Sequence, residues 1–531
     1  MRPLYHRSTG ITLFGLVSVL LLGFLPHAFA FSTGEAATLV IGDPSLTAFN
    51  PGATSTGLVG PFALAFDSSH NLWVADSYGN RILEYKAPFS TDEAASIVIG
   101  QSNFTGLGSA TTSTGLSTPN GLAFDSGGNL WVSDSSNNRI LEYRAPLSTG
   151  EAASIVIGQS NFTGSGERTT ATGLDNPYGL TFDSSGNLWV ADLQNGRVLE
   201  YTAPFSTGEA ASLVIGEPNF VTSNDQVSLR GLNAPDAVAF DSSGNLWVAD
   251  GHRNLEYTAP LSTHEPASMV IGQNNFTNSS TVTTSAGMDG PGDLAFDSSG
   301  NLWVSDGHRV LEYTAPLSTH EPASMVIGQN NFTNSSTVTT SAGMNGPGDL
   351  AFDSSGNLWV SDTDNNRVLE YQAPFSTYEA ASLVIGQPNF TSAAQTPIFS
   401  PTAASLNHPQ GVAFDSSGNL WVADWAAGRV LEYGGSTSGA SSSSSTTSTS
   451  TSTTSTTSRS STTVQSSVTT SSSATTSTTT TSTSTSVAST SSQGSSSSLS
   501  TSYLFLLAAQ AGVILLMAVV PVGRLRNRKR T

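Results

Sequence analysis

Short apolar runs bounded by Asp, Asn, Ser and Gly recur along the central part of the chain. In one unit they are GLAFD (121–125), NLWVSD (129–134), RILEYR (139–144) and ASIVIG (153–158). Their length and their turn residues are typical of strands joined by tight turns. Both faces of these strands are apolar, so each sheet needs a neighbour on both sides. The pattern predicts four short strands per unit and no helix before the Ser/Thr-rich tract.

The four-strand unit occurs seven times in the sequence. The block FDSSGNLWVAD, or a close variant, recurs every 56 to 62 residues with one tryptophan per copy: Trp73, Trp131, Trp189, Trp247, Trp303, Trp359 and Trp421. Two units are near copies, because EPASMVIGQNNFTNSSTVTTSAGM occurs at 265–288 and again at 321–344. Four-stranded sheets repeated around an axis form a β-propeller, whereas a solenoid would have to cap exposed edges.

The two ends of the repeat region are incomplete in complementary ways. The segment FSTGEAATLVIG (31–42) corresponds to a fourth strand without its first three. Residues 411–433 hold three strands that lack a fourth. We therefore expect the N-terminal strand to complete the last blade and close the ring. The predicted fold is all-β, a seven-bladed β-propeller of four-stranded blades over residues 31–434.

The repeated string is Pro-x-Gly-[Leu/Val]-Ala-Phe-Asp, then Gly-Asn-Leu-Trp-Val-[Ala/Ser]-Asp, then Asn-Arg-[Ile/Val]-Leu-Glu-Tyr. It resembles the NHL repeat over most of residues 36–433, with longer links between blades and a shorter second turn in units four and five. The resemblance implies a propeller. Members of that family bind proteins, RNA or small ligands, and some are enzymes, so the resemblance does not settle the chemistry.

Residues present in every unit have structural explanations. The Asp before each first turn, such as Asp125, is expected to accept turn N–H groups. A calcium site there would have only one carboxylate, where calcium usually takes several oxygens. The second repeated acid is expected to pair with an Arg across a hairpin turn, as Asp134 with Arg139, for about 0.5–1 kcal/mol if exposed. The Trp is expected to pack between blades.

Function is expected where the copies differ. The second turns and the links between blades share one face of the predicted ring, and this variable face carries the differences. The residues after the repeated Pro should ring the channel mouth: Phe62, Asn120, Tyr178, Asp236, Gly292, Gly348 and Gln410. The second turns add Tyr78, Gln194, His252, His308, Asp364 and Trp425. Such an aromatic and polar rim suits a peptide, glycan or small ligand, and drift in solvent-exposed turns is the alternative.

The pattern offers no clear catalytic residue. Related propellers that act as lyases or lactonases hold a metal or a catalytic His in the channel, but the eight His residues here are scattered. Asp236, Asp293 and Asp349 near the mouth could hold a cation. We expect no cofactor and no metal, with calcium the weaker alternative. Three readings stay open: a binding module, a passive component of the envelope, and a metal-dependent lyase or lactonase-like enzyme.

Composition narrows the partners. The absence of cysteine excludes disulfides, thiolate metal sites and cysteine nucleophiles. The net charge is −20, and the central body, with 11 basic and 39 acidic residues, carries 11 − 39 = −28. This charge argues against nucleic acid as a partner and favours cations or basic surfaces.

The two ends are expected to address the chain to a membrane. Residues 1–30 have the basic start, apolar middle and Ala-x-Ala close of a signal peptide, with an uncleaved anchor as the alternative. Residues 435–502 are Ser and Thr in the main and predict a disordered, extended stalk. The uncharged run Tyr503–Val522 is long enough to cross a lipid bilayer as a helix, and residues 523–531 form a basic tail expected in the cytoplasm.

The links also carry Asn-x-Ser/Thr sites at Asn103, Asn161, Asn275, Asn278, Asn331, Asn334 and Asn389. These predict N-glycosylation in an extracellular setting, and a glycan cover would also fit a face that binds nothing. The chain leaves the last blade after a third strand, so we expect the variable face to point away from the membrane. The sequence thus predicts a single-pass surface protein whose propeller binds an extracellular protein or glycan.

Overall fold

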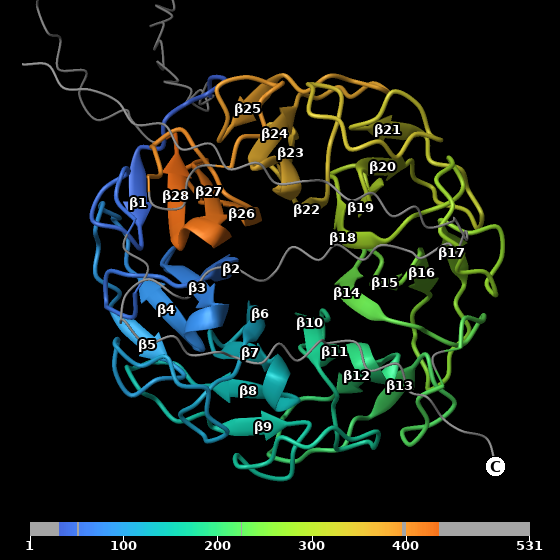
Figure 1. The fold of residues 1–531 in the computed structure, drawn as a ribbon. Helices are drawn as coiled ribbons and strands as arrows, with labels where there is room; N and C mark the ends of the chain where they lie inside the picture. Colours follow the sequence, from blue (N-terminus) through green and yellow to red (C-terminus); the bar gives the residue numbers. More distant parts are fainter. Residues whose placement is uncertain (1–30, 50–51, 225, 396–399, 435–531) are drawn as a thin grey trace, which may run out of the picture. The chain divides into compact units, whose positions relative to one another are not determined.

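The computed structural model describes residues 31–49, 52–224, 226–395 and 400–434. These residues form seven four-stranded antiparallel sheets arranged as blades around a central axis (Figure 1). The seven-bladed propeller predicted from the repeats is therefore confirmed. The predicted signal peptide, stalk, membrane span and basic tail lie outside the described residues. Among the described residues, no helix is both long and apolar enough to cross a membrane.

Every blade runs from an innermost first strand to an outermost fourth strand, as the following bounds show. Blade 1 is β2 (Pro61–Phe66), β3 (Leu72–Asp76), β4 (Arg81–Tyr85) and β5 (Ile97–Ile99). Blade 2 is β6 (Pro119–Phe124), β7 (Leu130–Asp134), β8 (Arg139–Tyr143) and β9 (Ile155–Ile157). Blade 3 is β10 (Pro177–Phe182), β11 (Leu188–Asp192), β12 (Arg197–Tyr201) and β13 (Leu213–Ile215). Blade 4 is β14 (Pro235–Phe240), β15 (Leu246–Asp250), β16 (Arg253–Tyr257) and β17 (Met269–Ile271). Blade 5 is β18 (Pro291–Phe296), β19 (Leu302–Asp306), β20 (Arg309–Tyr313) and β21 (Met325–Ile327). Blade 6 is β22 (Pro347–Phe352), β23 (Leu358–Asp362), β24 (Arg367–Tyr371) and β25 (Leu383–Ile385). Blade 7 is β26 (Pro409–Phe414), β27 (Leu420–Asp424), β28 (Arg429–Tyr433) and β1 (Leu39–Ile41).

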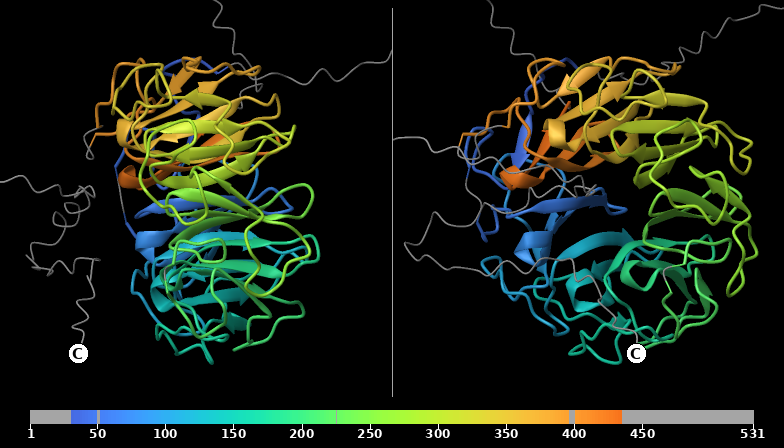
Figure 2. Two further views of the ribbon diagram at one scale, coloured as in Figure 1. Left: turned by 90° about the vertical axis from the view of Figure 1, so that its right-hand side faces the viewer. Right: turned by 45° about the vertical axis from the view of Figure 1, so that its right-hand side comes forward.

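The ring is closed by the first strand of the chain. β1 pairs antiparallel with β28, with Leu39 opposite Glu432 and Val40 opposite Leu431. Thr38 extends this pairing, because its backbone N–H donates to the carbonyl of Glu432 at 2.8 Å. The expected closure is confirmed, and Figure 2 shows the blades following one another around the axis.

The second turn, between the second and third strands, is a 3-10 turn in five of the blades. A single 3-10 turn joins the second and third strands: η1 (Ser77–Gly79), η2 (Ser135–Asn137), η3 (Leu193–Asn195), η4 (Thr363–Asn365) and η5 (Trp425–Ala427). Blades 4 and 5 use a shorter turn with Gly251 and Gly307 at φ of 60° and 59°. The left-handed conformation explains why glycine stands there.

The hydrophobic core lies in the seams between blades. Each of the seven buried clusters among the described residues combines side chains from two neighbouring blades. Trp73 illustrates the pattern, because its ring meets Phe124 of the next blade edge to face at 5.6 Å. Its Nε1–H donates to Asp67 Oδ2 at 3.0 Å. The predicted packing role of the repeated Trp is confirmed.

The repeated acids also behave as predicted, with one correction. Asp125 Oδ1 accepts the backbone N–H groups of Gly127 and Asn129 and so closes the first turn. The second acid pairs with the Arg across the hairpin, as Asp134 with Arg139 at 2.6 Å. Our energy for an exposed pair does not apply, because both side chains of this pair are 0% exposed.

The third link of each blade has a role that the sequence did not predict. One backbone N–H in it donates to a valine carbonyl on the fourth strand of the preceding blade, as Gly150 to Val98 at 2.8 Å. The residues that donate in this way are Gly34, Asp92, Gly150, Gly208, His264, His320 and Tyr378. These links, which we placed on the face of the first turns, also cap the outer edge of the neighbouring sheet, which would otherwise be open to pairing.

Candidate functional site

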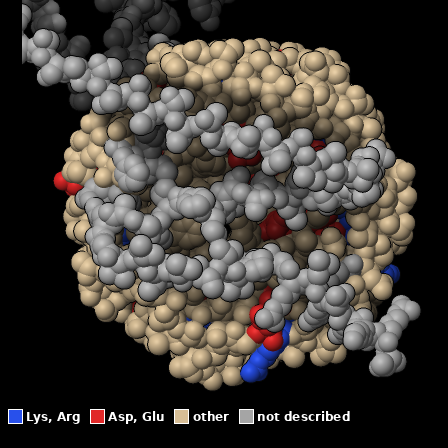
Figure 3. Space-filling model, viewed as in Figure 1, with Lys and Arg blue, Asp and Glu red and all other residues tan. Residues whose placement is uncertain are grey.

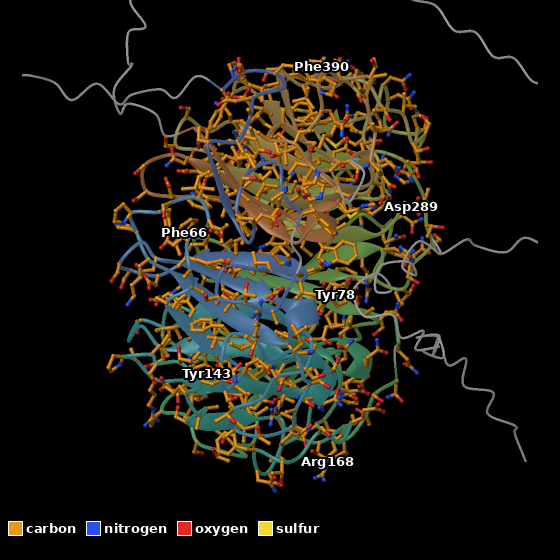
Figure 4. All side chains as sticks on the ribbon, turned by 60° about the vertical axis from the view of Figure 1, so that its left-hand side comes forward. Phe66, Tyr78, Tyr143, Arg168, Asp289 and Phe390 are labelled. Carbon is orange, nitrogen blue, oxygen red and sulfur yellow. The ribbon has the colours of Figure 1, made fainter. Side chains whose placement is uncertain are left out.

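The variable face is built as expected from second turns and interblade links. In blade 1, Asn80 Nδ2 donates to the carbonyl of Leu107, and Gln101 Nε2 donates to the carbonyl of Asn80. These contacts bring the second turn and the following link together. Figure 4 shows Tyr78 and Asp289 toward this side of the ring and Phe66 toward the other. The second turns and the first turns therefore lie on opposite faces of the ring, as the order of strands in the repeat predicts.

The mouth positions are the residues after the first-strand Pro of each blade. They lie on the innermost strands. The pairing of these strands with the second strands shifts register just after the Pro, as between Pro177 and Leu180. Phe62 of blade 1 and Tyr178 of blade 3 meet edge to face, with ring centroids 6.4 Å apart. Blade 2 lies between those blades, so both rings extend in front of it into the channel.

The other mouth positions differ in reach. Asn120 turns toward its own blade, where its Nδ2 donates to Ser135 Oγ at 3.2 Å. Gly292 is exposed, and Gly348 and Gln410 are partly buried. Glycine leaves the mouth without side chains in blades 5 and 6. The mouth is therefore aromatic on one side and open on the other.

A second aromatic group lies on the turns of blades 7 and 1. Tyr78 in η1 and Trp425 in η5 have ring centroids 5.5 Å apart, and His408 lies 6.2 Å from the Trp425 ring. Tyr78 remains 53% exposed. These residues come from both ends of the chain and meet only because the ring closes. Nothing in the sequence spacing of His408 indicated this contact.

The three acids near the mouth separate into two environments. Burial, helped by the charge of Asp250, raises the pKa of Asp236 to about 6. Asp293 and Asp349 hydrogen-bond to each other, and burial raises the pKa of both carboxyls. Neighbouring charged carboxylates repel each other, so ionisation of both carboxyls at once is disfavoured.

Asp293 and Asp349 also join neighbouring blades. Asp293 Oδ2 accepts the N–H of Leu350 in blade 6, and Asp349 Oδ2 accepts the N–H of Val412 in blade 7. Blades 2, 3 and 7 carry glycine at this position. A carboxylate one residue after the mouth position was visible in the sequence, but its use as a link between blades was not.

The cation site that we considered for these acids is not assembled. No group of three His, Asp or Glu side chains within the described ranges is arranged to hold a metal ion. The first-turn carboxylates, the calcium alternative, are occupied by turn amides and by Trp Nε1–H groups. The expectation that the chain holds no metal and no cofactor stays a prediction.

The sequon residues lie on the interblade links. Asn103, Asn161, Asn275, Asn331 and Asn389 are exposed, and Asn278 and Asn334 are partly exposed. In the first of these, Asn103 Oδ1 accepts both the N–H and the hydroxyl of Thr105, at 2.9 and 2.7 Å. The side chains are thus accessible, as a glycan acceptor requires.

A cavity of about 470 Å³ lies away from the mouth, between blades 4 and 5 at the face of the first turns. Trp247, Met269, Phe296 and Leu317 supply its apolar wall. At four other seams a Phe of the third link covers the Trp, as Phe375 covers Trp303 with ring centroids 4.8 Å apart. Leu317 is smaller than Phe, which leaves space at this seam.

Figure 3 looks onto the variable face and shows acidic atoms inside the central opening. The mouth positions include no Lys or Arg. The mouth of the variable face is therefore aromatic and acidic, and it offers stacking and hydrogen-bond acceptance.

Comparisons with known proteins agree with the repeat assignment. The NHL repeat family matches residues 344–371 and 406–433, and the SMP-30/Gluconolactonase/LRE-like region matches residues 90–211. No curated protein gives a significant match to the sequence.

Solved structures with similar chain paths are distant in sequence. A streptogramin B lyase is 14% identical, with 73% of this chain and 97% of the other covered and a TM-score of 0.43. Virginiamycin B lyase from Staphylococcus aureus is 14% identical, with 70% and 94% covered and a TM-score of 0.41. The extracellular domain of a hybrid two component system from B. thetaiotaomicron is 16% identical, with 74% and 43% covered and a TM-score of 0.46. The chain thus spans less than half of that last structure. What these proteins act on says nothing about this chain. The chain carries NHL repeats at residues 344–371 and 406–433, within a seven-bladed β-propeller.

Proposed function

We propose that this protein is a cell-surface binding module that captures an extracellular protein, glycan or small ligand on the variable face. The propeller stands on a Ser/Thr-rich stalk, anchored by Tyr503–Val522, with the basic tail in the cytoplasm and sugars on the link sequons. The end of β28 at Tyr433 supports this orientation, because it lies at the face of the first turns, opposite the mouth. The mouth then faces outward.

One observation carries the proposal: aromatic residues stand at mouth and turn positions where the blade fold does not need them. Tyr78 corresponds to Ser136 in blade 2 and Gln194 in blade 3. Trp425 corresponds to Ser135 and Thr363, whose hydroxyls donate to a Pro carbonyl of the next blade at 2.7 and 2.8 Å. Tryptophan has no hydroxyl to make that bond. Tyr78 is exposed and Trp425 is partly exposed, and aromatic side chains accessible at such positions favour recognition over packing.

The test replaces each aromatic residue by the residue of a sister blade. We screen the full chain on glycan and peptide arrays, alongside Tyr78→Ser, Trp425→Ser and Tyr178→Asn. Loss of about 1–3 kcal/mol per aromatic contact reduces capture about fivefold or more, with an unchanged melting temperature.

The matched control is Tyr378→Gly. Tyr378 is also an exposed aromatic residue, at 42%, but it lies in a third link on the outer edge, where sister blades carry Gly150 and Gly208. This variant is expected to keep full capture. If no ligand is found, or if all four variants bind alike, the binding role of the mouth is wrong and a passive envelope role is favoured.

An enzymatic function is the second candidate, because the SMP-30/Gluconolactonase/LRE-like region matches residues 90–211. The protein would then be a metal-dependent lyase or lactonase-like propeller. Metal analysis of the purified chain together with a lactone-hydrolysis assay tests this candidate. Tightly bound metal with turnover supports the enzyme. The absence of both supports the binding module.

A further inference from the structure

Tyr178, Phe62 and Asp236 lie in one sector of the channel mouth. Tyr178 and Asp236 hold the same position in blades 3 and 4, whose innermost strands are in contact. A Cβ added at Gly179, next to Tyr178, would lie 2.7 Å from the carbonyl oxygen of Asp236. The Phe62 ring reaches the Tyr178 ring from the other side at 6.4 Å. Tyr178 and Asp236 therefore occupy neighbouring mouth positions, and Phe62 shares this sector through its contact with Tyr178.

The Asp236 carboxyl differs from the other acids of the mouth in having no protein donor. Asp293 and Asp349 each accept a backbone N–H from the next blade. Among the residues that the structure describes, none donates a hydrogen bond to the Asp236 side chain, and the charge of the acid Asp250 helps to raise its pKa. A half-buried carboxylate without a donor is costly to keep ionised.

The blade fold does not require an acid there. The sister positions hold Phe62, Asn120, Tyr178, Gly292, Gly348 and Gln410, none of which is charged. Asp236 also has no basic partner, whereas the structural acids are paired, as Asp250 is with Arg253 at 2.7 Å. Its charge is therefore available to a group from outside the chain.

We propose that the mouth binds a basic peptide, and that a Lys or Arg side chain of this peptide donates to Asp236 while lying against the Tyr178 and Phe62 rings. Carboxylates and aromatic faces are the two surfaces that attract an ammonium or guanidinium group. The surplus of acids on the body, 39 against 11 basic residues, attracts such a peptide from a distance. This inference rests on the proposed binding function and names its ligand class.

The probe is a blocked tetra-arginine peptide, with tetra-serine and tetra-glutamate peptides of the same length for comparison. Binding to the full chain is measured by calorimetry at pH 7.5 and about 0.15 M salt, where distant charges are screened. Tetra-arginine is expected to bind, and the other two peptides are not. Asp236→Asn is expected to weaken binding about tenfold or more, because a charge-assisted bond is lost. Tyr178→Asn is expected to weaken it several-fold.

The control is Glu167→Gln, which removes one charge from an exposed residue of the link between blades 2 and 3 on the same face. It is expected to change affinity by less than about twofold. Equal weakening by Asp236→Asn and Glu167→Gln would show that only general charge attraction acts, and it would overturn the proposal.

The two proposals fail in different ways. If a neutral ligand from the arrays binds, is lost in Tyr178→Asn and is unaffected by Asp236→Asn, while tetra-arginine does not bind, the binding function stands and the basic ligand is wrong. If neither tetra-arginine nor any array ligand binds, both are wrong.

Discussion

The arginine that begins each third strand holds three parts of the blade together. Arg139 donates through Nε to Asp134, and its Nη groups donate to the carbonyls of Phe162, Thr112 and Gly115. One guanidinium thus joins the hairpin to the links before and after it. A lysine has one nitrogen and could not make all of these bonds. This geometry explains why the Asp–Arg pair occurs in all seven blades.

Replacing Arg139 by Met is expected to destabilise the fold by about 3–5 kcal/mol, because it leaves a buried carboxylate unpaired. Arg144→Met is the control, since the Arg144 side chain is 62% exposed, and its partner Glu142, though buried, keeps a hydrogen bond from Ser154. That change is expected to cost less than about 1 kcal/mol. Denaturant unfolding of both variants measures the difference, and similar costs would contradict the structural role of the buried pair.

Asp236 makes stability depend on pH. Its folded pKa of about 6 lies above the ordinary value of 3.8, so the folded chain holds the proton more tightly than the unfolded chain. The stability from this group is complete below about pH 4 and is lost as the pH rises through 6. Asp236→Asn is therefore expected to be more stable than the wild type at pH 7.5, by at most about 3 kcal/mol, and equal to it near pH 4.

Thermal unfolding of both proteins across that pH range measures the effect, without ligand present. A difference that stays constant from pH 4 to 7.5 would show that Asp236 is not desolvated in the folded chain.

At the scale of strands and links, the seams between blades explain what the repeats share and where they differ. The third link caps the outer edge of the preceding blade, and its Phe or Leu covers the Trp of that blade. Phe31, Phe89, Phe205 and Phe375 place their rings 4.7 to 4.8 Å from a Trp ring. The shared sequence of these links is therefore structural.

Leu317→Phe is expected to fill the cavity between blades 4 and 5 and stabilise the fold by about 0.5–1.5 kcal/mol through stacking on Trp247. The reverse change, Phe205→Leu, removes such a stack from Trp131 and is expected to lower stability by a similar amount. Melting temperatures of the two variants give the comparison. A destabilised Leu317→Phe would mean that the seam has no room for the ring.

The blades were predictable from the sequence because each apolar run, turn and Trp repeats seven times. The strand ends moved by a few residues, as with the predicted 153–158 against Ile155–Ile157. The contacts across blades could not be predicted, because Tyr78 and Trp425 are 347 positions apart and meet only in the closed ring. The mouth residues were named from their variation, but the separate environments of Asp236 and Asp293 depend on burial, which the repeat does not reveal.

At the scale of the whole propeller, ring closure produces the proposed site. Closure brings blade 7 against blade 1 and so assembles Tyr78, Trp425 and His408. Closure also gives β1 a partner on both edges. Val40 pairs with Leu431 on one edge, and its carbonyl accepts the N–H of Asp92 on the other. An open array would have neither the aromatic group nor a mouth.

A cysteine cross-link tests closure most directly, because the chain has no cysteine of its own. Leu39 lies opposite Glu432 in the closing pair, so Leu39→Cys with Glu432→Cys is expected to form a disulfide under mild oxidation. Leu39→Cys with Glu142→Cys is the control, since Glu142 holds the same position in blade 2 and faces Ile155. Intact-mass measurement of the full chain is expected to show the loss of two hydrogens, about 2 Da, in the first variant alone. A cross-link in both variants or in neither would contradict the closed ring.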